Sequence, residues 1–179
     1  MDSLITSGGY YMSKQQAGVF ATTAKLTAAL TLALLTACPA VAVPAPFEAV
    51  KGSWVGGGAL SYKDGRSEKL DCSAYYTGSN DGNALTTALR CSGSSGKFEL
   101  RSHLSYVGGK VSGSWEERTY NASGDASGTL TPGNLHLKIS GGVAGSITVA
   151  FSAASQTVSI TLATSEVPVK AMHFDFKRS

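Results

Sequence analysis

The chain has 179 residues, which is enough for one domain once an N-terminal targeting segment is set aside. Charged residues make up only 15% of it and glycine occurs 21 times, which favours a turn-rich, all-β domain over a helical one. The formal net charge is +3 and the basic residues are scattered, so charge gives no indication of nucleic-acid binding.

Residues 1–37 have the features of an export signal. Lys14 and Lys25 provide a basic region, residues 27–35 a short apolar region, and Ala37 a small residue before a cleavage point. The apolar stretch is too short for a transmembrane helix, which needs roughly 20 residues. Residues 1–11 have the character of an over-long start, which makes Met12 a candidate initiator.

Two cleavage points compete at the end of this signal. Leu35-Thr36-Ala37-Cys38 resembles the cleavage box of bacterial lipoproteins, which implies a lipidated Cys38, a membrane anchor and a linker over residues 38–46. Cleavage after Ala42 or Ala45 would instead release a soluble protein without Cys38. We therefore expect an exported bacterial protein, either periplasmic or an outer-membrane lipoprotein.

From residue 47 to the C-terminus, apolar residues alternate with polar ones between turn signals. Such alternation is typical of strands that bury one face. It predicts a single β domain over residues 47–179, with about eight to ten short strands. The clearest strand covers residues 98–106, whereas the small, polar stretch 121–131 predicts only a weak strand.

Short links between these strands favour pairing between neighbours in sequence. A long antiparallel meander must hide its apolar face and its edges, which it can do by closing into an up-and-down barrel. We expect that barrel, with a β-sandwich as the alternative. Gly56-Gly57-Gly58 would allow the sharp bending that closure needs.

Cys72 and Cys91 lie on consecutive expected strands, joined by a turn-rich stretch over residues 79–83. Hairpin pairing would bring the two side chains opposite each other. In an oxidising compartment such a pair predicts a disulfide. A metal or redox pair is the alternative, but the sequence lacks the Cys-x-x-Cys spacing for it.

Gly52-Ser53-Trp54 opens the first expected strand, and Arg178 ends the last. This arrangement resembles the calycin barrels, which include lipocalins and avidins. The resemblance implies that Trp54 plugs one end of the barrel and that Arg178 stacks over it, a favourable cation–π pair. A second copy, Gly113-Ser114-Trp115, shows that the motif is short enough to recur.

The chain from residue 47 onward also resembles a family of small exported bacterial β-proteins. The matching pieces cover residues 52–58, 88–91, 97–100 and 111–117. The resemblance implies export and a β fold, and it carries no activity.

No catalytic, cofactor or metal motif emerges from the sequence. His103, His136 and His173 fall on the polar faces of their strands and give no convergent zinc-binding pattern. Glu116 and Glu117 are adjacent on a strand, so they point to opposite faces and cannot share a proton. We therefore expect a protein that is not an enzyme and needs no cofactor.

The leading hypothesis is an envelope protein that binds a small apolar or amphipathic ligand inside the barrel. The alternative is a filled core, as small barrels often have, in a protein-interaction module such as an assembly factor or an inhibitor. Inward-facing small residues at Gly124, Ala126 and Gly128 would leave room for a cavity. The candidate pocket residues are Leu100, Leu104, Tyr106, Phe151, Met172 and Phe174.

Overall fold

The computed structural model describes residues 45–79 and 81–179. The expected signal segment (residues 1–37), the candidate start at Met12 and the candidate lipidation site at Cys38 lie outside the described residues, as does the linker up to residue 44. Export and lipidation therefore stay predictions. In the described part of the chain, no helix is long and apolar enough to cross a membrane.

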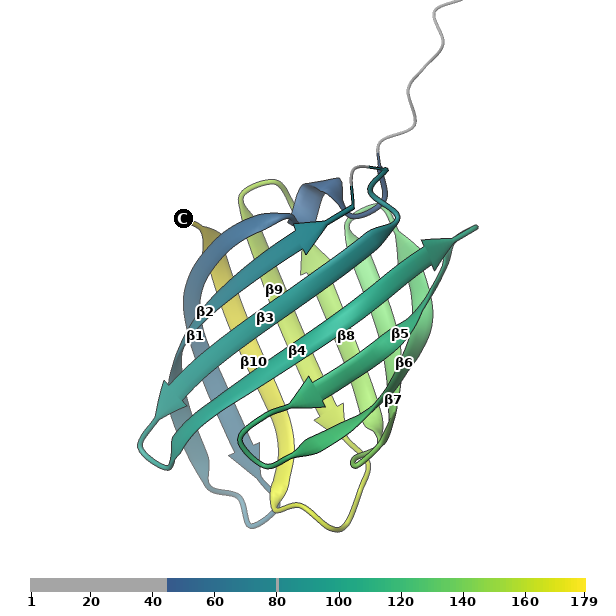
Figure 1. The fold of residues 1–179 in the computed structure, drawn as a ribbon. Coiled ribbons are helices and arrows are strands. Elements are labelled where there is room, and N and C mark those ends of the chain that lie inside the picture. The colour runs from purple at the N-terminus through teal and green to yellow at the C-terminus, as the bar shows by residue number, and fades with distance from the viewer. Residues whose placement is uncertain (1–44, 80) are drawn as a thin grey trace, which may run out of the picture. The chain divides into compact units, whose positions relative to one another are not determined.

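Ten antiparallel strands close into one barrel in the described chain (Figure 1). Each strand pairs with its neighbours in sequence, and β1 pairs with β10 to complete the circle. The up-and-down barrel predicted from the short links is confirmed, and the sandwich alternative is wrong. The elements are η1 (Glu48–Val50, a 3-10 turn), β1 (Gly52–Tyr62), β2 (Ser67–Gly78), β3 (Ala84–Gly93), β4 (Gly96–Val107), β5 (Lys110–Glu117), β6 (Ala122–Thr131), β7 (Asn134–Gly141), β8 (Gly145–Phe151), β9 (Ser155–Leu162) and β10 (Val169–Arg178).

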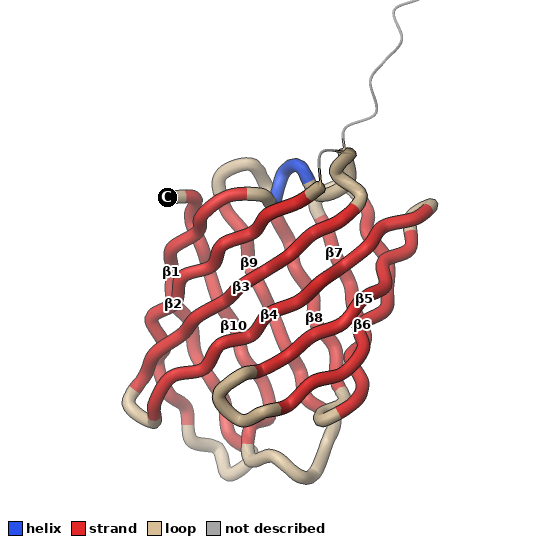
Figure 2. Tube along the Cα trace, in the orientation of Figure 1, coloured by secondary structure: helices blue, strands red, loops and turns tan. Residues whose placement is uncertain are grey.

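The up-and-down order sorts the connections into two sets at opposite ends of the barrel (Figure 2). We call one the closed end: it holds η1, the C-terminus and the loops before β3, β5, β7 and β9 (top of Figure 1). We call the other the open end: it holds the loops at residues 63–66, 94–95, 118–121, 142–144 and 163–168.

Alternation of side chains decides what faces the interior. In β7, for example, Leu135, Leu137 and Ile139 are buried, whereas His136 and Lys138 are exposed. This is the period of two that a half-buried strand imposes. The apolar faces of the strands thus all meet inside the barrel.

β6 occupies nearly the range expected from its sequence, but it is better paired than the prediction of a weak strand indicates. Its inward positions include Ala122, Gly124, Ala126 and Gly128, which give little hydrophobic contrast with the serines and threonines between them. The strand nevertheless runs for 10 residues, because its backbone pairs along its length with β5 and β7. Neighbouring strands, rather than local propensity, hold it in place.

Two glycines let β1 approach β10 closely where the barrel closes. A Cβ atom at Gly56 would collide with the carbonyl oxygen of Asp175, and one at Gly58 with that of His173. In the β1–β10 ladder these glycines lie opposite Phe176 and Phe174, both almost fully buried. The large rings occupy the space that the missing side chains leave.

The predicted disulfide between Cys72 and Cys91 is confirmed. The two residues are direct partners in the β2–β3 ladder, and their sulfur atoms are bonded across 19 positions of sequence. Both side chains are buried in the wall between the two ends. Such a bond is typical of an oxidising, exported compartment.

Candidate ligand cavity

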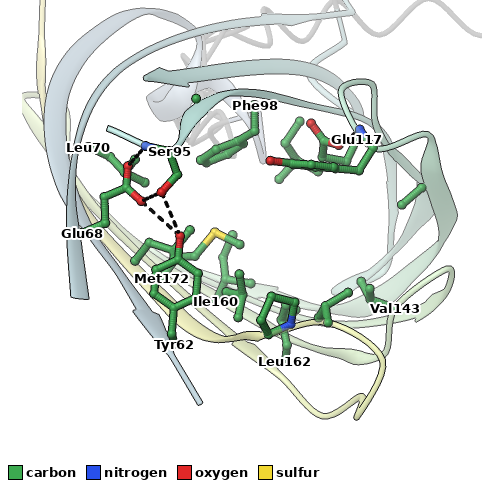
Figure 3. Close-up of a pocket in the computed structure, with 18 of the residues that line it drawn as sticks. Tyr62, Glu68, Leu70, Ser95, Phe98, Glu117, Val143, Ile160, Leu162 and Met172 are labelled. Atoms are coloured by element: carbon green, nitrogen blue, oxygen red, sulfur yellow. Dashed lines mark hydrogen bonds between the residues drawn. The ribbon is translucent and has the colours of Figure 1, made fainter. Parts of the chain in front are cut away.

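A cavity of about 400 Å³ lies inside the barrel at its open end. Its volume falls within the roughly 300–1,000 Å³ that is typical of small-molecule sites. The lining is almost entirely apolar. In Figure 3, Leu70, Phe98, Leu162 and Met172 surround the empty space.

The cavity exists because the inward side chains do not fill the barrel. Leu100, Ile147 and Leu162 face inward, yet each is only half-buried, since the space in front of it is empty. Of the small inward residues of β6, Ala122 lines this cavity, whereas Gly124, Ala126 and Gly128 do not. The core is accordingly not a filled one.

A hydrogen-bonded group fixes one side of the cavity mouth. The Ser95 backbone N–H donates to Glu68 Oε1 at 2.7 Å, and the Tyr62 hydroxyl donates to Glu68 Oε2 at 3.0 Å. The Ser95 hydroxyl also donates to Oε2 (Figure 3). These bonds, those from Ser95 above all, lower the pKa of Glu68 to about 2. Glu68 thus ties the β3–β4 loop to the end of β1 as a carboxylate.

Glu117 holds another side of the mouth in the same manner. Its Oε1 accepts hydrogen bonds from the backbone N–H groups of Glu99 at 3.0 Å and Thr119 at 3.1 Å, and its Oε2 accepts one from Tyr120 at 2.6 Å. The lone pairs of both mouth carboxylates are therefore engaged by the protein itself. They position loops and are poorly suited to acid–base chemistry on a ligand.

A second, smaller chamber of about 80 Å³ lies deeper in the barrel, toward the closed end. Most of its lining is apolar, but it includes four polar side chains: Tyr76, Thr87, Ser102 and Gln156. Burial raises the pKa of Tyr76 to about 12, so its phenol stays protonated at neutral pH.

The structure divides the six predicted pocket residues among three environments. Leu100 and Met172 line the larger cavity, while Leu104 and Phe151, together with Leu100 again, line the smaller chamber. Tyr106 lines neither and packs edge-on against Phe47, with ring centres 6.4 Å apart. The alternation of side chains along a strand predicts which of them face the interior, but it does not predict how deep in the barrel each one lies.

Phe174 also lines neither space. It is fully buried, with its ring centre 6.3 Å from that of Phe98 and 6.1 Å from that of Phe176. It is a core residue because β10 pairs with the glycine-rich β1, whose missing side chains it replaces.

Several lining residues were not foreseen from the sequence. Ile147, Ile160 and Leu162 belonged to apolar strand faces without being assigned to the site, and so did Tyr62 at the mouth. The other mouth residue, Glu68, carried no signal of its own. Gln156 did carry one. Gln156 alternates with Val158 and Ile160 on the inward face of β9, so it is a polar residue at a position where the pattern predicts an apolar one.

At the closed end, the structure brings together the two predicted closure residues. The guanidinium carbon of Arg178 lies 4.3 Å from the centre of the Trp54 ring. Arg178 also donates hydrogen bonds to the backbone carbonyl oxygens of Ala49, Lys51 and Ala153. Trp54 is fully buried and donates from Nε1 to the carbonyl oxygen of Val50 at 2.9 Å.

The three histidines lie apart on the outside of the barrel. His103, His136 and His173 are exposed on β4, β7 and β10, and each pairs through Nδ1 with a threonine or serine hydroxyl on a neighbouring strand. Within residues 45–79 and 81–179, no group of His, Cys, Asp and Glu side chains is arranged to hold a metal ion.

Fold and site together define a ten-strand, calycin-like barrel with an internal apolar cavity. No family model matches the chain, and no curated protein matches it. The predicted membership of a family of small exported bacterial proteins therefore stays a prediction.

Solved structures nevertheless share the fold. The crystal structure of Rv2717c from M. tuberculosis is similar with a TM-score of 0.62 and 17% identity, over 78% of this chain and 99% of that one. The S-type phycobiliprotein lyase CPES from Guillardia theta is similar with a TM-score of 0.52 and 14% identity, over 74% of this chain and 90% of that one. At these identities the likeness shows the calycin-like barrel fold alone.

Proposed function

We propose that this protein is a non-enzymatic binder of a small apolar or amphipathic ligand, which it holds inside the barrel. The observation that carries the proposal is the apolar cavity of about 400 Å³ at the open end. A protein-interaction module with a filled core would have no need of such a space. Burying a ligand's apolar surface there would supply binding free energy of about 25 cal/mol per Å².

The shape of the mouth supports reversible binding rather than catalysis. The carboxylates of Glu68 and Glu117 are occupied by hydrogen bonds from the protein, and Tyr120 is exposed at the rim. The mouth therefore offers shape, an aromatic edge and the exposed Lys97 side chain to an incoming ligand, and both of its carboxylates are already engaged by the protein.

The place where the protein acts is part of the same proposal. The disulfide and the signal-like N-terminus both favour the bacterial envelope, with a lipid anchor at Cys38. The mature mass of the natural protein and of Cys38→Ser tests the anchor. Lipidation predicts a loss of acyl mass and release into the soluble fraction for the variant. Identical processing and release would contradict it.

The first experiment is mass spectrometry, native and then denaturing, on protein purified gently from an envelope fraction. Ligand binding predicts an additional mass in the native spectrum that is lost on denaturation. A matched pair of variants locates it. Ile147→Trp places an indole in the cavity, whereas Ala150→Trp places the same side chain on the exposed face of the same strand.

The expected result is that Ile147→Trp loses the additional mass and Ala150→Trp keeps it. A thermal-shift screen with lipids and fatty acids gives a second readout, because a ligand that binds only the native state raises the unfolding temperature. A bare mass for the natural protein together with a flat response across the screen would overturn the proposal.

A further inference from the structure

The two internal spaces are separated by a single layer of side chains. Five residues line both of them: Leu100, Trp115, Ile139, Ile147 and Ile160. Leu100 and Ile147 are only half-buried, so they have room to change rotamer. A ligand in the larger cavity is thus one side-chain movement away from the deeper chamber.

The deeper chamber contains an unpartnered amide. Gln156 is 2% exposed, and neither its Oε1 nor its Nε2 makes a hydrogen bond within the described part of the chain. The amide lies close enough to the Tyr76 hydroxyl to offset part of the rise in the pKa of that phenol, but the two groups lack hydrogen-bonding geometry. A buried amide with two donors and an acceptor left unused is rare in native proteins.

The other polar groups of the chamber lie across from Gln156 on adjacent strands. Tyr76 pairs in register with Thr87, and Thr87 with Ser102. The Thr87 and Ser102 hydroxyls bond each other at 2.7 Å. Of the polar side chains that line the chamber, the Gln156 amide and the Tyr76 hydroxyl are the two for which the described residues form no hydrogen bond, so they can bind a guest.

The chamber is uncharged. Among the described residues that line it, there is no Asp, Glu, Lys, Arg or His. Two cations at that end are engaged elsewhere: Arg178 by Trp54 and three backbone carbonyl oxygens, and Lys51 by Glu48 and the carbonyl oxygen of Ser79. An anionic head group placed there would be buried without a counter-ion, at high cost.

We propose that the occupant is a neutral amphipathic molecule that binds with its polar end innermost. Its single hydrogen-bonding group, a hydroxyl, carbonyl or carboxamide, binds Gln156 and Tyr76 in the deeper chamber, and its apolar body fills the larger cavity. A chamber of about 80 Å³ accommodates such a group, or one or two waters in its absence. The inference rests on the proposed function and adds the orientation and the charge of the ligand.

The test compares three probes of equal chain length: octan-1-ol, octane and octanoate. Their dissociation constants are measured with the natural protein and with Gln156→Leu, which removes the amide at similar volume. We expect the variant to bind octanol about tenfold more weakly, because one hydrogen bond to a buried polar group is lost. Octane should bind the variant equally or more tightly. Tyr76→Phe should weaken octanol binding in the same sense.

Octanoate adds a charge test with the same body. It should bind the natural protein more weakly than octanol at neutral pH. Its affinity should rise as the pH falls through the ordinary pKa of a carboxyl group, about 4, because only the neutral acid suits the chamber. Glu68 stays ionised through that range, and octanol, which has no charge to lose, is measured at the same pH values as the control for the other ionisable groups of the mouth, Lys97 and Glu117.

The outcomes separate the inference from the function on which it rests. Binding of none of the probes to the natural protein would overturn the proposed function and the inference with it. Binding of all three with the same ratio of dissociation constants between variant and natural protein would leave the pocket standing and overturn the polar-end-innermost orientation. Waters alone would then occupy the deeper chamber. Octane binding to Gln156→Leu also shows that the variant is folded.

Discussion

The two Gly-Ser-Trp copies place their tryptophans, Trp54 and Trp115, in different surroundings. Trp54 lies at the closed end, fully buried, stacked by Arg178 and hydrogen-bonded to Val50. Trp115 lies between the two internal spaces, lines both, and donates to the carbonyl oxygen of Ser140 at 3.1 Å. One tryptophan seals the barrel and the other borders its cavity.

The difference comes from position in the barrel rather than from the tripeptide. Trp54 pairs with Arg178 on β10 and lies beneath η1, so protein packs around its whole ring. Trp115 pairs with Ser102 and Gly124 and is also buried, at 5% exposure, but its ring borders both internal spaces. The closed end is therefore built for stability and the open end for access.

The largest expected effect separates the two tryptophans directly. Trp54→Ala should lower the free energy of unfolding by about 4 kcal/mol, as for a large ring removed from a well-packed core. Trp115→Ala should cost less, about 3 kcal/mol, because its ring borders the two internal spaces and so has fewer packing partners than that of Trp54. Urea denaturation of both variants measures the pair. Equal losses would contradict a difference between the two ends.

The disulfide should stabilise both ends alike, since it crosslinks the wall between them. The double variant Cys72→Ala, Cys91→Ala should lose about 3 kcal/mol of stability, mainly because the unfolded chain regains freedom. Ligand binding by the folded fraction should change little. Loss of binding under conditions where the variant is folded would show that the crosslink also shapes the cavity.

Arg178→Ala tests the closed end without disturbing the core. Removing the stack on Trp54 and the bonds to three carbonyl oxygens should cost about 2 kcal/mol. Arg178→Lys should recover only part of this, because an ammonium cannot reproduce the planar fork. Lys177→Ala is the matched control and should change stability by less than about 0.5 kcal/mol. Equal effects of the two alanine substitutions would refute the closure role.

The smallest effect is confined to the open end and depends on pH. The pKa of Glu68 in the folded protein is lowered to about 2 from an ordinary 4.5, so its hydrogen bonds to Ser95 and Tyr62 are fully formed above pH 4.5. They should be lost as the pH falls through about 2. The Ser95 amide resonance, followed by NMR, should titrate in that window and not in Glu68→Gln. A midpoint near 4.5 would show that the hydrogen bonds from Ser95 and Tyr62 do not lower the pKa of Glu68.

Much of the fold follows from local pattern. The alternation in β7, the turns between neighbouring strands and the spacing of Cys72 and Cys91 were sufficient to predict the hairpins, the meander and the disulfide. Closure was favoured over a sandwich because the short links pair neighbouring strands, and a closed meander hides both its apolar face and its edges. For β6, the sequence predicted the strand but underestimated how well it is paired. The alternation of apolar and polar side chains does not report the backbone hydrogen bonds that β6 forms with β5 and β7.

The sequence predicted which side chains face the interior of the barrel, but not at what depth each of them lies. Period-two alternation placed Leu100, Leu104 and Tyr106 on one side of β4, yet the three line different spaces or none. The level at which a side chain lies depends on strand tilt and on what the opposite wall presents, and both are properties of the closed barrel. Gln156 is a second example. The sequence shows a polar residue on an inward strand face, but it does not show that the amide has no hydrogen-bond partner among the described residues.

The order of the strands, their inward faces and the covalent link between β2 and β3 could be read from the amino-acid sequence, because these depend on neighbours along the chain. The hollow interior, the different places of the two tryptophans and the unpartnered amide among the described residues became apparent only in the folded barrel. Those features depend on volumes and contacts summed across the barrel from strands far apart in sequence, which no local pattern encodes.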